Sequence, residues 1–161
     1  MATDHVDVIL QQWQQQRPDL DCSSMAIIGR INRLSSLLNK QLAEVFKAHQ
    51  LSAVEFDILA TLRRSGNPQT PTELYQALLL SSGAMSTRLE QLVQRGLIER
   101  LAGEGDRRSC RVQLTEQGLQ LIDAALESHV ANMERILADF PARQREALAS
   151  LLQQLSGQVE G

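Results

Sequence analysis

The chain has little that would place it in a membrane or outside the cell. No part of its 161 residues approaches the ~18 consecutive apolar residues that a membrane-spanning helix requires. Residues 1–10 lack the basic start and apolar core of a signal peptide. Only two cysteines occur, Cys22 and Cys110, and two thiols without an export signal are typical of reduced cysteines in the cytoplasm. We therefore expect a cytoplasmic protein with no membrane contact.

The patterns of enzymes and metal sites are also missing. The histidines His5, His49 and His129 are far apart and form no pair at the spacing of helical metal ligands. The sequence contains no glycine-rich phosphate loop and no serine-nucleophile motif. Catalysis, a metal site and a cofactor are therefore not expected. A protein-interaction module would account for amphipathic helices, but it would leave the distribution of basic residues unexplained.

The net charge of -3 argues against a uniformly basic nucleic-acid binder, yet the charges are unevenly distributed. Residues 1–59 contain five basic and seven acidic side chains, and residues 113–161 contain three basic and seven acidic side chains. Between them, residues 60–112 contain eight basic and five acidic side chains. Because attraction to DNA depends on the local field, a basic middle between acidic flanks indicates a local DNA-contacting surface.

Apolar periodicity and capping signals divide the chain into helices and one hairpin. Ser52 with Glu55, and Thr70 with Glu73, form capping boxes, and Thr115 can cap a long helix. In chain order, we expect helices over about residues 6–13, 24–49, 52–64, 70–80 and 82–95, strands over 97–101 and 110–114, and helices over 115–140 and from 141 onward.

Two short helices followed by a hairpin with an arginine-rich tip are typical of a winged helix-turn-helix. The expected fold class is therefore mainly α with a small β-hairpin wing. In the expected recognition helix, over residues 82–95, the apolar side chains lie on one arc, and small or polar side chains lie on the other, where the backbone can approach the major groove. Arginines at the tip can reach phosphates or a narrow minor groove. The expected DNA contacts are Ser82, Gly83, Ser86, Thr87, Gln91, Arg107 and Arg108.

Several motifs in this region resemble the MarR family of bacterial regulators. They are residues 70–74 (TPTEL), 81–89 (SSGAMSTRL), 96–100 (GLIER), 106–108 (DRR) and 114–118 (LTEQG). The resemblance implies a homodimer whose N- and C-terminal helices interlock, and a ligand cleft between these helices and the DNA-binding lobe. We accordingly expect N-terminal helices for dimerisation and the ligand cleft over residues 1–50, a winged helix-turn-helix lobe over 51–114, and C-terminal dimerisation helices over 115–161. Long apolar stripes on terminal helices independently favour a dimer, which matches a palindromic operator.

A narrower resemblance links the chain to the urate-responsive branch of this family. It rests on Trp13, followed by residues 17–21 (RPDLD), and it implies effector-binding roles for Trp13, Asp57, Arg88 and Arg100. Arg88 borders the apolar arc of its helix, where a charge needs a partner that Asp57 could supply. An anionic planar ligand near Trp13 would then compete for Arg88 and move the recognition helix.

Other roles for these residues stay open. Trp13 lies on an apolar stripe and would also serve as a packing anchor, and Asp57 could be a solvated acid near Arg64. Arg88 could contact a phosphate, and Arg100 could pair with the neighbours of Glu99 across the hairpin. The sequence thus predicts a repressor that binds a palindromic operator and is released by a small anionic aromatic effector, such as urate or an aromatic acid. No other partner class and no cofactor are expected.

The alternative is a thiol-based redox sensor. Arg108 and Arg111 favour the reactive thiolate of Cys110, whereas neighbouring acids disfavour the thiolate of Cys22. Loss of DNA binding on peroxide treatment, reversed by thiol, would favour a switch at Cys110 or Cys22.

Overall fold

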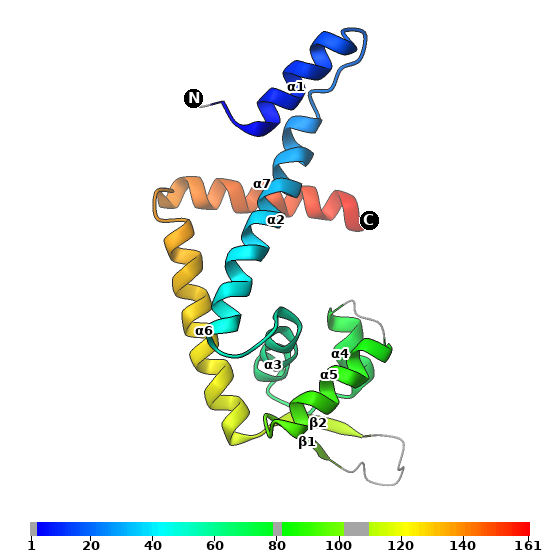
Figure 1. Cartoon of the computed structure of the whole chain (residues 1–161), viewed down its shortest axis with the longest axis vertical. Coiled ribbons are helices and arrows are strands. Elements are labelled where there is room, and N and C mark those ends of the chain that lie inside the picture. The colour runs from blue at the N-terminus through cyan, green and yellow to red at the C-terminus, as the bar shows by residue number, and fades with distance from the viewer. Residues whose placement is uncertain (1–2, 79–81, 102–109) are drawn as a thin grey trace. The chain divides into compact units, whose positions relative to one another are not determined.

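The computed structural model describes residues 3–78, 82–101 and 110–161, apart from the side chain of Ser82. The described part is mainly α with one two-stranded antiparallel sheet, as the sequence predicts (Figure 1). The chain divides into two compact units, Met1–Glu44 and Val45–Gly161. The elements are α1 (His5–Gln16), α2 (Met25–Ala48), α3 (Ala53–Ser65), α4 (Pro71–Leu78), α5 (Ser82–Gln94), β1 (Ile98–Leu101), β2 (Arg111–Leu114), α6 (Glu116–Ile136) and α7 (Ala142–Glu160).

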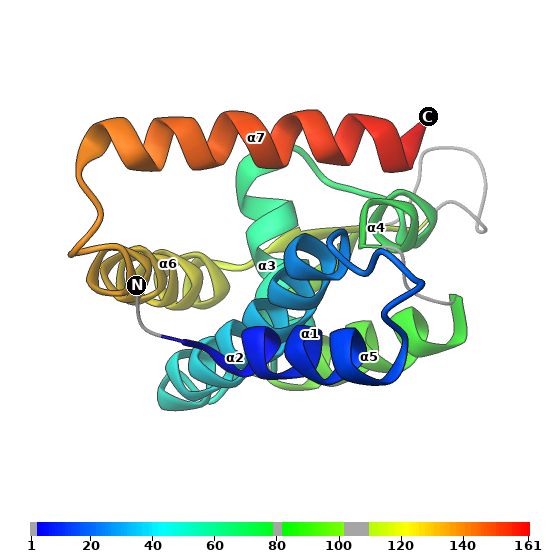
Figure 2. The same cartoon turned by 90° about the horizontal axis from the view of Figure 1, so that it is seen from above.

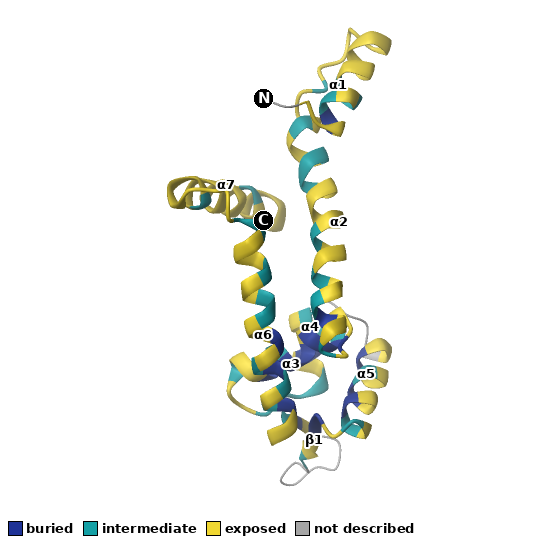
Figure 3. Cartoon of the chain, turned by 60° about the vertical axis from the view of Figure 1, so that its left-hand side comes forward, coloured by how far each residue is buried: buried dark blue, intermediate teal, exposed yellow. Residues whose placement is uncertain are grey.

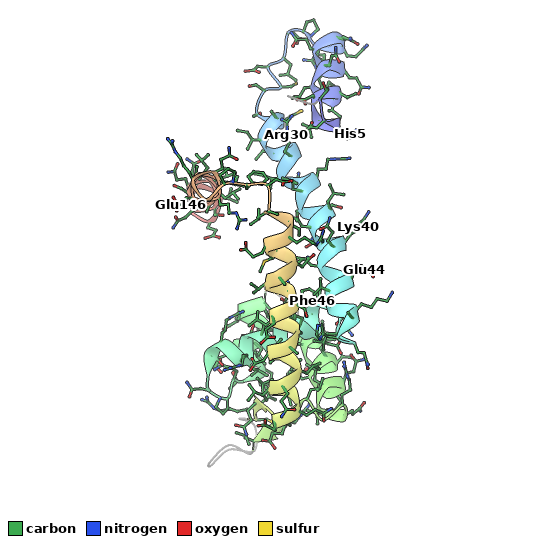
Figure 4. The ribbon with its side chains drawn as sticks, turned by 90° about the vertical axis from the view of Figure 1, so that its left-hand side faces the viewer. His5, Arg30, Lys40, Glu44, Phe46 and Glu146 are labelled. Atoms are coloured by element: carbon green, nitrogen blue, oxygen red, sulfur yellow. The ribbon has the colours of Figure 1, made fainter. Side chains whose placement is uncertain are left out.

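In the first unit, the start of α1 is fixed to α2 by charge and by close packing. Asp4 caps α1 by accepting hydrogen bonds from the backbone of Val6 and Asp7. Arg30 of α2 donates to Asp4 at 2.8 Å and to Asp7 at 2.6 Å, and Figure 4 shows it beside the start of α1. Val6 is buried and lies beside Gly29 of α2. The N-terminal end of α1 is therefore anchored.

In the second unit, the predicted capping residues form the hydrogen bonds that begin the helices. The Oε2 of Glu55 accepts from the backbone N–H of Ser52 at 2.8 Å, and the Oε2 of Glu73 accepts from that of Thr70 at 2.6 Å. The hydroxyl of Thr115 accepts from the first turn of α6. These contacts confirm the three helix starts that the sequence predicts.

The core of the second unit forms around α3, whose Ile58 and Leu59 are fully buried. Figure 3 shows dark blue on α3 and on the parts of α5, α6 and β1 near it. The hairpin pairs Ile98 with Leu114 and Arg100 with Val112. The N–H and C=O of Val112 also bond the backbone of Gln69, before α4. The hairpin is thus tied to the segment that leads into the helix-turn-helix.

The sequence pattern extends α6 too far. The helix ends at Ile136, and Phe140 lies in the following turn, where its N–H donates to the carbonyl of Leu137. Phe140 precedes Pro141, and a residue before proline disfavours the helical conformation. Arg145 donates to the carbonyls of Leu137 and Phe140, which closes the turn. Beyond it, α7 runs steeply inclined to α6 (Figure 2).

Candidate DNA interface and effector site

The two faces of α5 differ sharply in burial. Met85 and Leu92 have no exposed surface, and Leu89 is 2% exposed. The opposite face is exposed and consists of small or polar residues: Gly83, Ser86, Thr87, Glu90, Gln91 and Gln94. One face therefore fixes the helix to the lobe and the other is exposed, which is the division that the sequence predicts.

Four of the seven predicted DNA contacts lie on this exposed face, namely Gly83, Ser86, Thr87 and Gln91. Ser82 begins α5, but its side chain lies outside the described part of the chain, and so do Arg107 and Arg108. The first turn of α5 carries no acidic side chain, whereas Glu73 occupies that position in α4. A helix start without a carboxylate in its first turn suits a phosphate, because the helix dipole is positive at that end.

The C-terminal end of α5 is held by an arginine that directly follows it. Arg95 donates to the Oε1 of Glu55 at 2.8 Å and to the carbonyl of Gln50 at 2.8 Å. Burial raises the pKa of Glu55, but the hydrogen bonds from Ser52 and the charge of Arg95 outweigh it and hold that pKa below its ordinary value. The Glu55 carboxylate thus completes the cap at the start of α3 and holds the end of the recognition helix.

Glu55→Gln is expected to lower the free energy of unfolding by about 1–3 kcal/mol at neutral pH, because Arg95 loses its anionic partner. A depressed folded-state pKa adds stability above the ordinary glutamate pKa of 4.5, and this contribution is lost as the pH falls through the folded value. The difference from wild type should therefore shrink in acid. Urea unfolding of both proteins at neutral pH and near pH 3 measures it, and an unchanged difference would contradict the role of the ionised carboxylate.

The predicted effector residues do not form one charge cluster in this conformation. Arg88 donates to the Oε1 of Gln91 at 3.0 Å, and within the described residues it forms no ion pair with Asp57. Although Asp57 keeps solvent contact, partial burial raises its pKa, and the charges of Arg64 and His129 oppose this rise. Arg64 is the neighbour in the alternative interpretation of the sequence, whereas an ion pair of Asp57 with Arg88 is absent from the described residues.

Among the described residues, Arg100 forms its ion pair with the recognition helix. It donates to the Oε2 of Glu90 in α5 at 2.9 Å, while Glu99 accepts from Gln113 across the hairpin. Neighbouring strand residues point to opposite faces, so Arg100 shares the face of the buried Ile98, next to α5. This pair with α5 differs from the pairing across the hairpin that the sequence left open, where Glu104 and Asp106 lie outside the described residues.

Trp13 belongs to the first unit, where it is 42% exposed on α1. The first unit holds a cavity of about 450 Å³ at the turn after α1, and the second holds one of about 220 Å³ between α3, β2 and α6. Neither is lined by Trp13, Asp57, Arg88 or Arg100. Cys22, which lines the larger cavity, and Cys110 are both free and partly exposed.

Sequence reasoning missed the ion pairs of Arg95 with Glu55 and of Arg100 with Glu90. The first joins residues 40 apart, and local pattern assigns Glu55 to a cap alone. Predicting the second pair would have required knowing which face of β1 meets α5. For the first pair, the sequence offered one signal: Arg95 stands just before Gly96 at a helix end, where a basic side chain is favoured.

A helix-turn-helix made by α4 and α5, followed by a β-hairpin wing, defines a winged helix-turn-helix DNA-binding protein. The MarR family profile matches residues 49–109. The chain is 43% identical to the HTH-type transcriptional regulator PecS of Dickeya dadantii over 157 residues, which cover 96% of this chain and 92% of PecS. The chain belongs to the MarR family of transcriptional regulators.

Solved structures confirm the fold. A mutant MarR from Escherichia coli in complex with operator DNA has a TM-score of 0.70 and 23% identity, covering 89% of this chain and 96% of MarR. The organohalide-sensing regulator RdhR in its 2,4-dichlorophenol-bound form has a TM-score of 0.73 and 19% identity, covering 86% of this chain and 82% of RdhR. Across the residues that the structure describes, no helix is long and apolar enough to cross a membrane.

Proposed function

We propose that the chain is a homodimeric repressor that binds a palindromic operator and leaves it when a small anionic aromatic effector binds. The observation that carries the DNA role is the division of α5 into a fully buried apolar face and an exposed face of small and polar residues. This division lets the helix enter a major groove without exposing apolar side chains. Operator binding supports a cytoplasmic location.

The dimer is supported by helices that leave many apolar side chains exposed within the described part of one chain. α7 has no buried residue although it is 19 residues long, and an isolated helix of that length is marginal in water. A twofold mate would cover these faces and place two recognition helices about 34–36 Å apart, at successive major grooves. The exposed apolar residues include Ile27, Ile28, Leu34 and Leu37 of α2, Leu126, Val130 and Met133 of α6, and Leu148, Leu151 and Leu152 of α7.

The effector proposal rests on complementary chemistry. Trp13 offers an exposed aromatic face. Arg88 and Arg100 offer cationic groups whose hydrogen bonds within the described residues are exposed, so an anion can compete for them. Asp57, with its raised pKa, is a candidate to hydrogen-bond a ligand N–H or O–H. Urate and aromatic carboxylates match this set, and the dichlorophenol bound by RdhR supports an aromatic effector.

The experiment that tests this function is a mobility-shift titration against the DNA upstream of the protein's own gene, with and without urate and a panel of aromatic acids. We expect a specific shift that one of these anions weakens. A shift that is indifferent to every acid but abolished by peroxide would move the switch to a cysteine. Absence of any specific shift on neighbouring promoters would overturn the regulator proposal.

Thr87→Ala is expected to weaken operator binding about five- to 150-fold, since a good contact to a base edge contributes roughly 1–3 kcal/mol. The hydroxyl of Thr87 bonds only the carbonyl of Gly83 within its own helix, so thermal unfolding should change little. Ser150→Ala removes an exposed hydroxyl from α7 and is the matched control, for which we expect unchanged binding. Equal affinities of both variants and wild type would remove Thr87 from the interface.

A further inference from the structure

One acidic side chain lies on the face of α5 that we assign to DNA. Glu90 is 54% exposed, and it follows Ser86 and Thr87 by one helical turn. It is the only Asp or Glu in the α5 sequence. A carboxylate at this position would repel the phosphates that surround the groove, and repulsion between unit charges a few ångströms apart is appreciable even near water.

The hairpin supplies the charge that cancels it. Arg100 of β1 donates to Glu90 at 2.9 Å, and within the described residues this is the ion pair that Glu90 forms. Both side chains are about half exposed, and exposed pairs contribute little to folding stability. The consequence of the pair is therefore electrostatic: it removes a negative charge from the face of the recognition helix.

The neighbouring arginine of α5 does not share this task. Arg88 precedes Glu90 by two residues, which corresponds to a rotation of about 200° around the helix axis. It donates instead to Gln91. Among the described residues, the Glu90 carboxylate is therefore neutralised by one side chain, Arg100, which comes from a different element.

We propose that Arg100 and Glu90 form an electrostatic latch that controls DNA binding. While the pair is closed, the exposed face of α5 is neutral at this point and accepts DNA. An anion that takes Arg100 away uncovers the Glu90 carboxylate, which then repels the phosphates and releases the operator. The inference rests on the proposed function because it requires α5 to face DNA, and it adds the group through which an anionic effector acts.

The test is a double-mutant cycle with Arg100→Gln, Glu90→Gln and the double variant, read as operator affinity by fluorescence anisotropy at fixed salt. Arg100→Gln should weaken binding about tenfold, since it leaves Glu90 uncompensated. Adding Glu90→Gln should restore most of this loss, and Glu90→Gln alone should bind as well as wild type or better. If the double variant binds as weakly as Arg100→Gln, Arg100 contacts DNA directly and the latch is overturned. If Glu90→Gln alone binds more weakly, Glu90 reads a base and the latch is likewise overturned.

The matched control is the pair of Arg63 in α3 with Asp123 in α6. It is also an arginine–carboxylate pair, at 2.7 Å, and both side chains are similarly exposed. Neutralising either member should leave operator affinity unchanged. A loss equal to that of Arg100→Gln would show that the effect comes from net charge alone and would overturn the latch.

A second arm uses urate as the probe and the emission of Trp13, the only tryptophan, as the readout of binding. Glu90→Gln should bind urate as wild type does but release operator at several-fold higher urate. Unchanged release would overturn the latch as the route of the effector. Wild-type protein that binds operator but not urate would remove urate as effector, while the mutant cycle still decides the latch. Wild-type protein without specific operator binding would overturn both proposals.

Discussion

Gly118→Ala is expected to be among the most damaging single substitutions in the chain, with a loss of about 3 kcal/mol or more in the free energy of unfolding. A Cβ at this position would overlap the carbonyl oxygen of Leu97, and backbone cannot move aside as a flexible side chain can. The same carbonyl accepts the N–H of Thr115, whose hydroxyl donates to Gly96 and caps α6. Thermal unfolding should show a decrease of the midpoint by roughly 6–12 °C.

Gly157→Ala provides the matched control. Gly157 also lies inside a helix, α7, and a Cβ there would meet nothing within 4 Å. Alanine has the higher helix propensity, so this variant should be more stable than wild type by about 0.5–1 kcal/mol. If both variants behaved alike, the close approach of α6 to the start of β1 would not be what requires glycine at position 118.

The capping motifs explain why the helix starts could be predicted from sequence. Ser52 and Glu55, like Thr70 and Glu73, are three residues apart, so the hydrogen bonds that start their helices are local. The buried arc of α5 could be predicted for a similar reason, because helical periodicity alone separates Met85, Leu89 and Leu92 from their neighbours.

Contacts between distant segments could not be predicted in the same way. The local pattern identifies Glu55 as part of a cap, but nothing local shows that Arg95 shares its carboxylate. The pairing of Arg100 with Glu90 depends on which face of the strand meets α5, and a shift of one residue would reverse that face. The overlap at Gly118 is likewise visible only once β1 and α6 are placed together.

Apolar periodicity located the terminal helices but could not show what covers them. The same pattern describes a helix buried in its own lobe and one buried by a second copy. The lobe covers the apolar face of α3, where Ile58 is fully buried. By contrast, α7 has no buried residue, and only Arg145 and Leu155 are partly covered. The difference between the two helices is what makes the oligomeric state testable on α7.

The double substitution Leu151→Glu with Leu152→Glu is expected to convert the proposed dimer into monomers. Leu151 is 63% exposed and Leu152 is 44% exposed, so neither change opens a cavity in the lobe. Two carboxylates in an apolar interface would each have to be desolvated without a partner, which opposes association strongly. Because a monomer binds one half-site without the gain of a linked second one, operator affinity should fall by about 10²-fold or more.

Sedimentation measures the association, and anisotropy with the operator and with a single half-site measures its consequence. Gln153→Glu is the control, because it adds a carboxylate to α7 about 100° away from Leu152, beyond the apolar stripe. It should stay dimeric with unchanged operator affinity. The double variant should retain the helical content and unfolding transition of the lobe, and its affinity for a single half-site should equal that of wild type. A double variant that remained dimeric would exclude α7 from the interface, and the exposed apolar faces of α2 and α6 would then have to form it.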